Sequence, residues 1–150
     1  MKEVWFFFSI WLLQGIAMLM DEFIFHHKRG LGKWESLGHP IDTFFFLLPF
    51  IYCLSFPVNS EMTFLYLSVI SCLVITKDEW IHQQQASARE TWLHAIQFIL
   101  HPISLYTLFH FWQEGLTNLI KFQTIIIIFF MMYQIIYWNF LRRNKYAIKN

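Results

Sequence analysis

Charged residues are scarce in this 150-residue sequence, where Asp, Glu, Lys and Arg together make up 14%, against roughly a quarter in ordinary soluble domains. Only two cysteines occur, which excludes a scaffold held together by disulfides. The net charge is +1 with histidine neutral. Because so balanced a chain has no strong attraction for a polyanion, we expect no nucleic-acid partner.

Apolar residues take the place of the missing charge. Hydrophobic residues make up 57% of the chain and aromatic residues 21%. A soluble domain of this size leaves about a third of its unfolded-chain surface exposed, so it could not hide eighteen Phe and seven Trp. The composition excludes disorder and predicts an integral membrane protein whose first partner is the lipid bilayer.

Five apolar runs approach the roughly 20 residues that a helix needs to cross a bilayer. With their polar ends included, the predicted spans cover residues 4–27, 39–58, 62–82, 91–112 and 119–141. The alternation typical of a β-barrel is missing. We therefore predict an all-α, polytopic membrane protein with about five transmembrane helices, forming a single domain over residues 1–150. The first run is long for a signal peptide and no small-x-small cleavage site follows it, so we interpret it as a span.

Lysine and arginine are distributed unequally between the two sides of these spans. Nine of the eleven lie on one side: between the first and second spans, at the end of the third span or between it and the fourth, or after the fifth. Lys2 and Lys121 lie on the other side. Because Lys and Arg accumulate on the cytoplasmic side of membrane proteins, we expect the amino terminus outside and the carboxyl terminus in the cytoplasm.

Histidines and carboxylates gather at the predicted cytoplasmic face, where six of the seven His and most of the Asp and Glu lie. Many of them are three or four residues apart and so share a helix face. Any one of them could simply solvate a helix end, but buried carboxylates are costly near a membrane and do not set orientation. The set predicts a metal or proton-active site. Its predicted metal ligands are Glu22, His26, His39, Asp42, Asp78, Glu79, His82, Glu90, His94 and His101.

Some of these assignments have alternatives. Asp42 and Asp78 could bind metal or orient a histidine ring, and His101 could be a ligand or support one. Three further polar residues are expected to face solvent or to pair with nearby basic residues: Asp21, His27 and Glu35.

The polar pattern occurs twice. Residues 21–39 read Asp-Glu-x3-His-x8-Glu-x3-His, and residues 78–94 read Asp-Glu-x2-His-x7-Glu-x3-His. This repetition predicts two similar helical hairpins that form a four-helix bundle, with the last helix as a fifth. In such bundles Glu and Glu-x-x-His ligands from facing helices hold two metal ions. A mixture of imidazole and carboxylate suits iron, manganese or zinc; we expect two transition-metal ions and favour iron.

In the composition and placement of these residues, the chain resembles the integral-membrane non-haem di-iron oxygenases of the fatty-acid hydroxylase and desaturase class, and secondarily ferritin-type bundles. His26-His27 is similar to half of a His-x-x-His-His box. A complete box is absent, so no catalytic residue is assigned. The resemblance implies hydroxylation or desaturation of a lipid or other apolar substrate, with electrons from an external electron-donor protein.

Other functions stay open. A zinc-dependent membrane hydrolase would use the same donors. An electron carrier with b-type haem or a quinone could use His94 or His101 with His39 as partner. A metal transporter is less favoured, because the predicted outer half of the bundle is nearly all apolar and offers no polar path.

Overall fold

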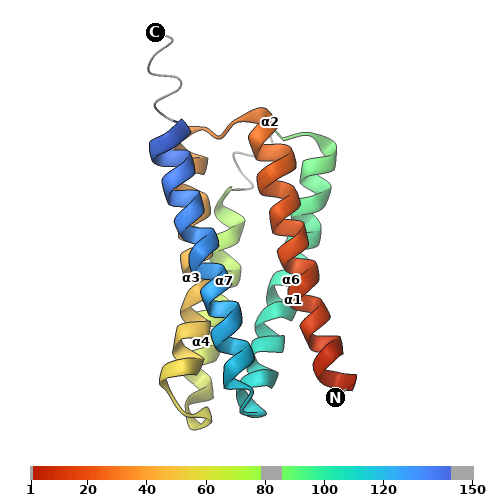
Figure 1. The fold of residues 1–150 in the computed structure, drawn as a ribbon, viewed down its shortest axis with the longest axis vertical. Coiled ribbons are helices and arrows are strands. Elements are labelled where there is room, and N and C mark those ends of the chain that lie inside the picture. The colour runs from red at the N-terminus through yellow and green to blue at the C-terminus, as the bar shows by residue number, and fades with distance from the viewer. Residues whose placement is uncertain (1, 79–85, 143–150) are drawn as a thin grey trace.

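In the computed structural model, residues 2–78 and 86–142 are described, and within these ranges the chain is helical without a β-strand. The all-α prediction is therefore confirmed. Five long helices run along one another as a bundle, with the two termini at opposite ends (Figure 1). They are α1 (Lys2–Met20), α3 (Lys33–Ser55), α4 (Glu61–Val74), α6 (Ala88–Gln113) and α7 (Thr117–Ile136).

Two of these helices change to wider turns at the end of the bundle that holds the carboxyl terminus. α1 continues through the π-helix η1 (Asp21–His26) into the short helix α2 (His27–Arg29), and α7 continues into the π-helix η4 (Tyr137–Leu141). A π-helix bonds residue i to i+5, so residues five apart share a face. In an α-helix they would point about 140° apart. Both ends of η1 therefore face the bundle interior.

The helix ends follow local chemistry. α3 begins earlier than the predicted residue 39, because the Gly32 amide donates to the Glu35 carboxylate (2.9 Å) and caps the helix. It ends at Ser55 rather than 58, since Phe56 precedes a proline and is extended. The 3-10 helix η3 (Ile75–Asp78) extends α4. Residues 79–82 of the third predicted span lie outside the described residues.

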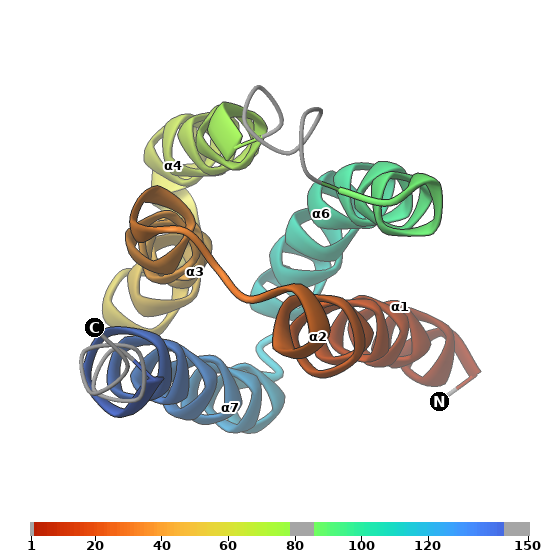
Figure 2. The same cartoon turned by 90° about the horizontal axis from the view of Figure 1, so that it is seen from above.

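Seen along the bundle axis, the five helices are arranged around one common interior, with α7 beside α3 and α6 beside α1 (Figure 2). The main partner of α1 is thus α6 rather than α3, its neighbour in the predicted first hairpin. α3 packs along α7 and α4, and α1 packs along α6. The repeated pattern predicts a four-helix bundle to which the last helix is added as a fifth. In the structure α7 is instead a full member of the bundle, with Ile120, Thr124 and Ile127 buried against its neighbours.

The apolar core fills the half of the bundle near the amino terminus. Trp11, Phe50, Leu108 and Phe111 lie at its centre and are almost fully buried. The Trp11 ring meets the Phe111 ring edge-on at 4.9 Å, while its indole N–H donates to the Ser104 carbonyl (3.0 Å). The polar groups described below are thereby confined to the other half.

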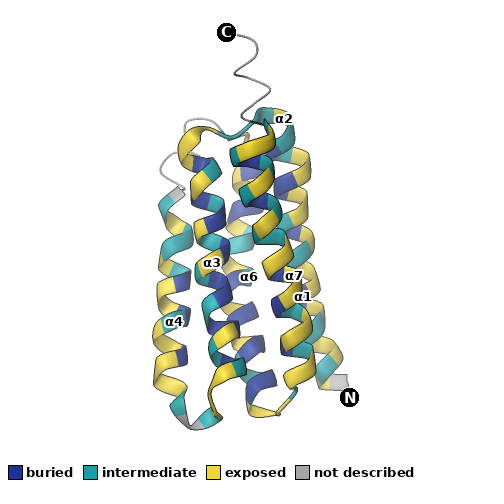
Figure 3. Cartoon of the chain, turned by 60° about the vertical axis from the view of Figure 1, so that its left-hand side comes forward, coloured by how far each residue is buried: buried dark blue, intermediate teal, exposed yellow. Residues whose placement is uncertain are grey.

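Exposed residues run along the outward faces of the helices from one end of the bundle to the other (Figure 3). Many of the exposed residues on all five helices are large and apolar. Soluble monomers rarely expose contiguous apolar surface on this scale. Three of the described helices, over Glu3–Arg29, Lys33–Ser55 and Thr117–Leu141, are long and apolar enough to cross a membrane. The fold is thus compatible with an integral membrane protein.

Truncating Leu108 to alanine should lower the free energy of unfolding by about 2–5 kcal/mol, because it leaves a cavity in the packed half of the bundle. Thermal unfolding in detergent measures the effect. Ile99→Ala, on the same helix but 63% exposed, is the control and should leave the melting temperature nearly unchanged. Equal shifts for the two variants would contradict the assigned core.

Candidate metal centre

Four buried side chains from two helices converge at the end of the bundle that holds α2. Asp21 and His26 come from η1, and Glu90 and His94 from α6; none is more than 7% exposed. Each offers one ligand atom, and these four atoms all lie within 4.8 Å of one another. We call these four residues the metal-ligand group.

The distances within the metal-ligand group suit one transition-metal ion. His94 Nε2 lies 3.2 Å from Asp21 Oδ1, and His26 Nε2 lies 3.4 Å from Asp21 Oδ1 and 3.7 Å from Glu90 Oε1. Ligand atoms bonded tetrahedrally at about 2.1 Å stand about 3.4 Å apart. The side chains therefore need only small movements to coordinate an ion.

Helix geometry explains how the sequence brings these residues together. Glu90 and His94 are four apart on one face of α6, and Glu90 also caps that helix, accepting from the Ser87 amide while its own amide donates to Ser87 Oγ (both 3.3 Å). Gln97, the next residue on this face, donates to the Ala17 carbonyl (3.1 Å) and ties α6 to α1. The prediction that Glu90 and His94 share a buried face is confirmed.

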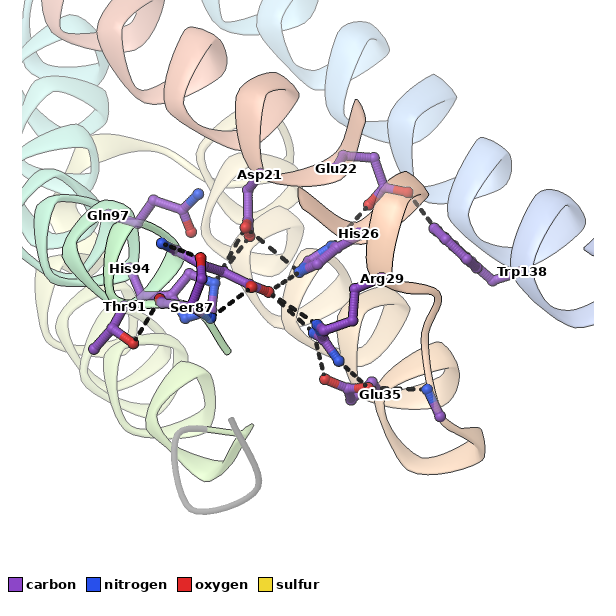
Figure 4. A network of polar contacts seen from close by, with 12 residues as sticks. Asp21, Glu22, His26, Arg29, Glu35, Ser87, Thr91, His94, Gln97 and Trp138 are labelled. Atoms are coloured by element: carbon purple, nitrogen blue, oxygen red, sulfur yellow. Dashed lines mark hydrogen bonds and ion pairs between the residues drawn. The ribbon is translucent and has the colours of Figure 1, made fainter. Parts of the chain in front are cut away.

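Arg29 joins α2, α3 and α6 beside the metal-ligand group (Figure 4). Its guanidinium donates through Nη1 and Nη2 to the two oxygens of Glu35, at 3.0 and 2.8 Å. Nη2 also donates to Glu90 Oε1 at 3.0 Å. Glu35 was expected either in solvent or paired with a basic residue; it is buried and paired with Arg29.

Negative charge exceeds positive charge in this buried cluster. Four carboxylates, Asp21, Glu22, Glu35 and Glu90, are buried there. Among the described residues two guanidiniums meet the cluster: Arg29 pairs with Glu35 and Glu90, and Arg142 donates to the His26 carbonyl at its edge (3.4 Å). With neutral imidazoles the carboxylates outnumber these guanidiniums by two, and an uncompensated buried charge is costly. A divalent cation held by the metal-ligand group would offset this difference.

Glu22 lies beside the metal-ligand group rather than within it. Its carboxylate accepts from the Trp138 indole N–H and from Gln134 Nε2 (3.5 Å). Glu22 Oε2 also faces His26 Nδ1 at 3.8 Å. Glu22 therefore connects the metal-ligand group to α7.

A cavity of about 90 Å³ extends from the metal-ligand group toward the middle of the bundle. His39 lines it, with its ring 4.6 Å from that of His26. His101 lines it on the α6 side, where Nε2 shares a hydrogen bond with Ser71 Oγ (2.8 Å). Gln14 also lines it, and its buried Oε1 has no hydrogen-bond partner among the described residues. The imidazoles of His26, His39 and His101 therefore border this cavity together with that of His94.

The other predicted ligands lie outside the metal-ligand group. Asp42 borders the same cavity and forms an ion pair with Lys77 (2.6 Å). The backbone of Asp78 ends η3, but its side chain lies outside what the structure describes, as do the whole of Glu79 and His82. From the second copy of the predicted repeat, residues 78–94, the structure places Glu90 and His94 in the metal-ligand group.

Comparison with known proteins was made against family models, curated proteins and solved structures. None of the three matches the chain. The resemblance to membrane di-iron oxygenases stays a prediction, and the functional argument depends on geometry and donor chemistry.

Asp21 was expected to face solvent or to pair with a nearby lysine or arginine, and the structure places it differently. It is buried, and both of its carboxylate oxygens lie 3.2 Å from His94 Nε2. The reason is the π-helix, which turns Asp21 and His26 to the same side although they are five residues apart. No α-helical spacing rule would have paired them.

His27 also differs from expectation, because it neither faces open solvent nor pairs with a basic residue. It is half-buried, hydrogen-bonds the Tyr133 hydroxyl (2.7 Å) and stacks on the Tyr137 ring at 4.7 Å. The sequence reasoning likewise missed Gln134 and Trp138. A glutamine within an apolar span was the available signal, since such a group needs a buried partner.

Replacing Arg29 with methionine should destabilise the metal-free protein by roughly 3 kcal/mol, because two buried carboxylates lose their cation. The same change frees Glu90 Oε1, so added Zn²⁺ should raise the melting temperature more than in wild type. Thermal unfolding in detergent with and without Zn²⁺ tests both effects. Lys28→Met, which removes a neighbouring exposed charge, should behave as wild type, and an Arg29→Met variant that does the same would refute the role of Arg29.

Proposed function

We propose that the protein is an integral-membrane metalloenzyme whose centre at the cytoplasmic face oxidises a lipid or other apolar substrate. The observation that carries the proposal is the convergence of the metal-ligand group, two imidazoles and two carboxylates, within a buried and negatively charged cluster. A structural salt-bridge network alone would not require the buried carboxylates to outnumber the guanidiniums of Arg29 and Arg142, as they do here by two.

The donor set supports iron as the metal. Two His and one carboxylate with open positions form the ligand set of non-haem iron oxygenases, and His26, His94 and Asp21 offer it. Glu90, which also accepts a hydrogen bond from Arg29, would be a fourth ligand. Bound iron would supply dioxygen activation, whereas zinc, which has no redox chemistry, would support hydrolysis instead. The predicted second ion stays a prediction, because its ligands would include Glu79 and His82.

The chain's own residues would shape the environment of the reaction. The cavity beside the metal-ligand group is much smaller than the pockets that enclose whole ligands, so only the reacting part of a substrate would enter it. Phe46, Phe98 and Phe130 line its walls and would hold an apolar segment. Gln14 Oε1 offers an acceptor deep in the cavity for a hydroxyl or water.

The same proposal includes five membrane spans with the amino terminus outside and the carboxyl terminus in the cytoplasm. α4 and α6 run beside the three helices that are long and apolar enough to cross a membrane, and they expose large apolar residues such as Leu73 and Ile99. The π-helix η1, which carries Asp21 and His26, leads into α2 at the same end of the bundle as the last described turn of the chain, η4 (Figure 1). Electrons would reach the metal-ligand group from a cytoplasmic donor protein.

Purified protein reconstituted with Fe²⁺ should retain metal, and a His26→Ala/His94→Ala variant should lose it, because the variant removes both imidazoles of the metal-ligand group. Elemental mass spectrometry gives the metal content per chain. His110→Ala, at the far end of α6, is the control and should retain wild-type content. Zinc retained in preference to iron would favour the hydrolase, and equal metal content in all three proteins would reject the centre.

Membrane topology can be read from reporters fused to each terminus. A reporter active only outside the cytoplasm should work at the amino terminus and not at the carboxyl terminus, because five spans place the two on opposite sides. Replacing Lys28 and Lys33 with glutamine should weaken this bias. Both reporters on one side would contradict an odd number of spans.

A further inference from the structure

Glu22 is predicted by sequence as a metal ligand, but its contacts assign it a different task. The carboxylate is almost fully buried and is held from the α7 side, where the Trp138 indole N–H and the Gln134 amide both donate to it. Figure 4 shows Glu22 and Trp138 on one side of the His26 ring, and Asp21 and His94 on the other. The imidazole of His26 thus lies between two sets of carboxylates.

The two ring nitrogens of His26 face these two sets separately. Nε2 is directed at the metal-ligand group, 3.4 Å from Asp21 Oδ1 and 3.7 Å from Glu90 Oε1. Nδ1 faces Glu22 Oε2 at 3.8 Å. A histidine that binds metal through one nitrogen almost always donates its other N–H to a carboxylate, carbonyl or water, which sets the tautomer and the ring orientation.

We propose that Glu22 is a positioning residue that keeps the Nδ1 proton of His26 in place and so presents the Nε2 lone pair to a metal ion. The inference rests on the metal site proposed above. It makes α7 part of the centre, because Trp138 and Gln134 hold Glu22 in the orientation that faces His26. Metal affinity should therefore depend on residues that never touch the ion.

The two π-helices provide the geometry for this arrangement. In η1 the wide turn directs Glu22 and His26 inward together with Asp21. In α7 and η4, Gln134 and Trp138 are four apart, both are buried, and both contact Glu22. π-helical turns occur frequently at functional sites. Here two of them meet at one carboxylate.

Titration with Co²⁺ in detergent distinguishes a positioning residue from a ligand. For Glu22→Gln we expect the same number of ions per chain at saturation, a dissociation constant 10- to 100-fold higher, and a changed visible absorption spectrum of the bound Co²⁺. Trp138→Phe removes the indole N–H that Glu22 accepts while keeping an aromatic ring at this position, and should change affinity and spectrum in the same direction but less. Trp92→Phe, on an exposed tryptophan of α6 (69% exposed), should match wild type.

Each alternative result has a defined meaning. A saturating stoichiometry lowered by one ion in Glu22→Gln would show that Glu22 is itself a ligand and overturn the inference. Wild-type affinity and spectrum in both Glu22→Gln and Trp138→Phe would make it a bystander. Trp138→Phe keeps the proposal testable if Glu22→Gln fails to fold, as judged by gel filtration. Wild-type protein that binds no Co²⁺ would instead reject the metal site itself, and the role of Glu22 with it.

Discussion

The burial of carboxylates at one end of an apolar bundle is the constraint on which the rest of this structure depends. Asp21, Glu22, Glu35 and Glu90 are withdrawn from water, and each must meet a donor or a cation. Arg29 serves two of them and thereby holds α2, α3 and α6 together. Asp21 and Glu90 also lie with His26 and His94 in the group that could hold a metal ion, so the same burial creates a candidate cation site.

The two halves of the bundle have opposite physical tasks. Around Phe50, Leu108 and Phe111 the interior is apolar and closely packed. In lipid, apolar surfaces gain little by leaving the solvent, so close packing of this kind would hold the helices together. The other half is polar, and its cavity stops at the level of Gln14 and His101. The packed half therefore closes the cavity toward the other end of the bundle. In the proposed enzyme this would leave the site open to one side only.

Glu90 and Glu22, which belong to or contact the metal-ligand group, also hold helices together. Glu90 caps α6, accepts from Arg29 and offers an oxygen to the metal-ligand group. Glu22 has contacts with both α7 and His26. A change in occupancy of the centre would consequently alter contacts between helices, and this coupling gives the last helix, α7, a reason to be buried rather than peripheral.

The all-α class, the approximate helices and the end of the bundle where polar residues gather could be predicted from the sequence, because they depend on composition and on spacing within one helix. The same spacing places Glu90 and His94 on one face. The contacts of Asp21 with His94, of Arg29 with Glu90 and of Trp138 with Glu22 could not be predicted in this way. These pairs are far apart in the chain, and helical periodicity shows which face a residue occupies but not which helix meets it. The π-helix at residues 21–26 changed even the face, since its i to i+5 bonding leaves no mark in α-helical spacing.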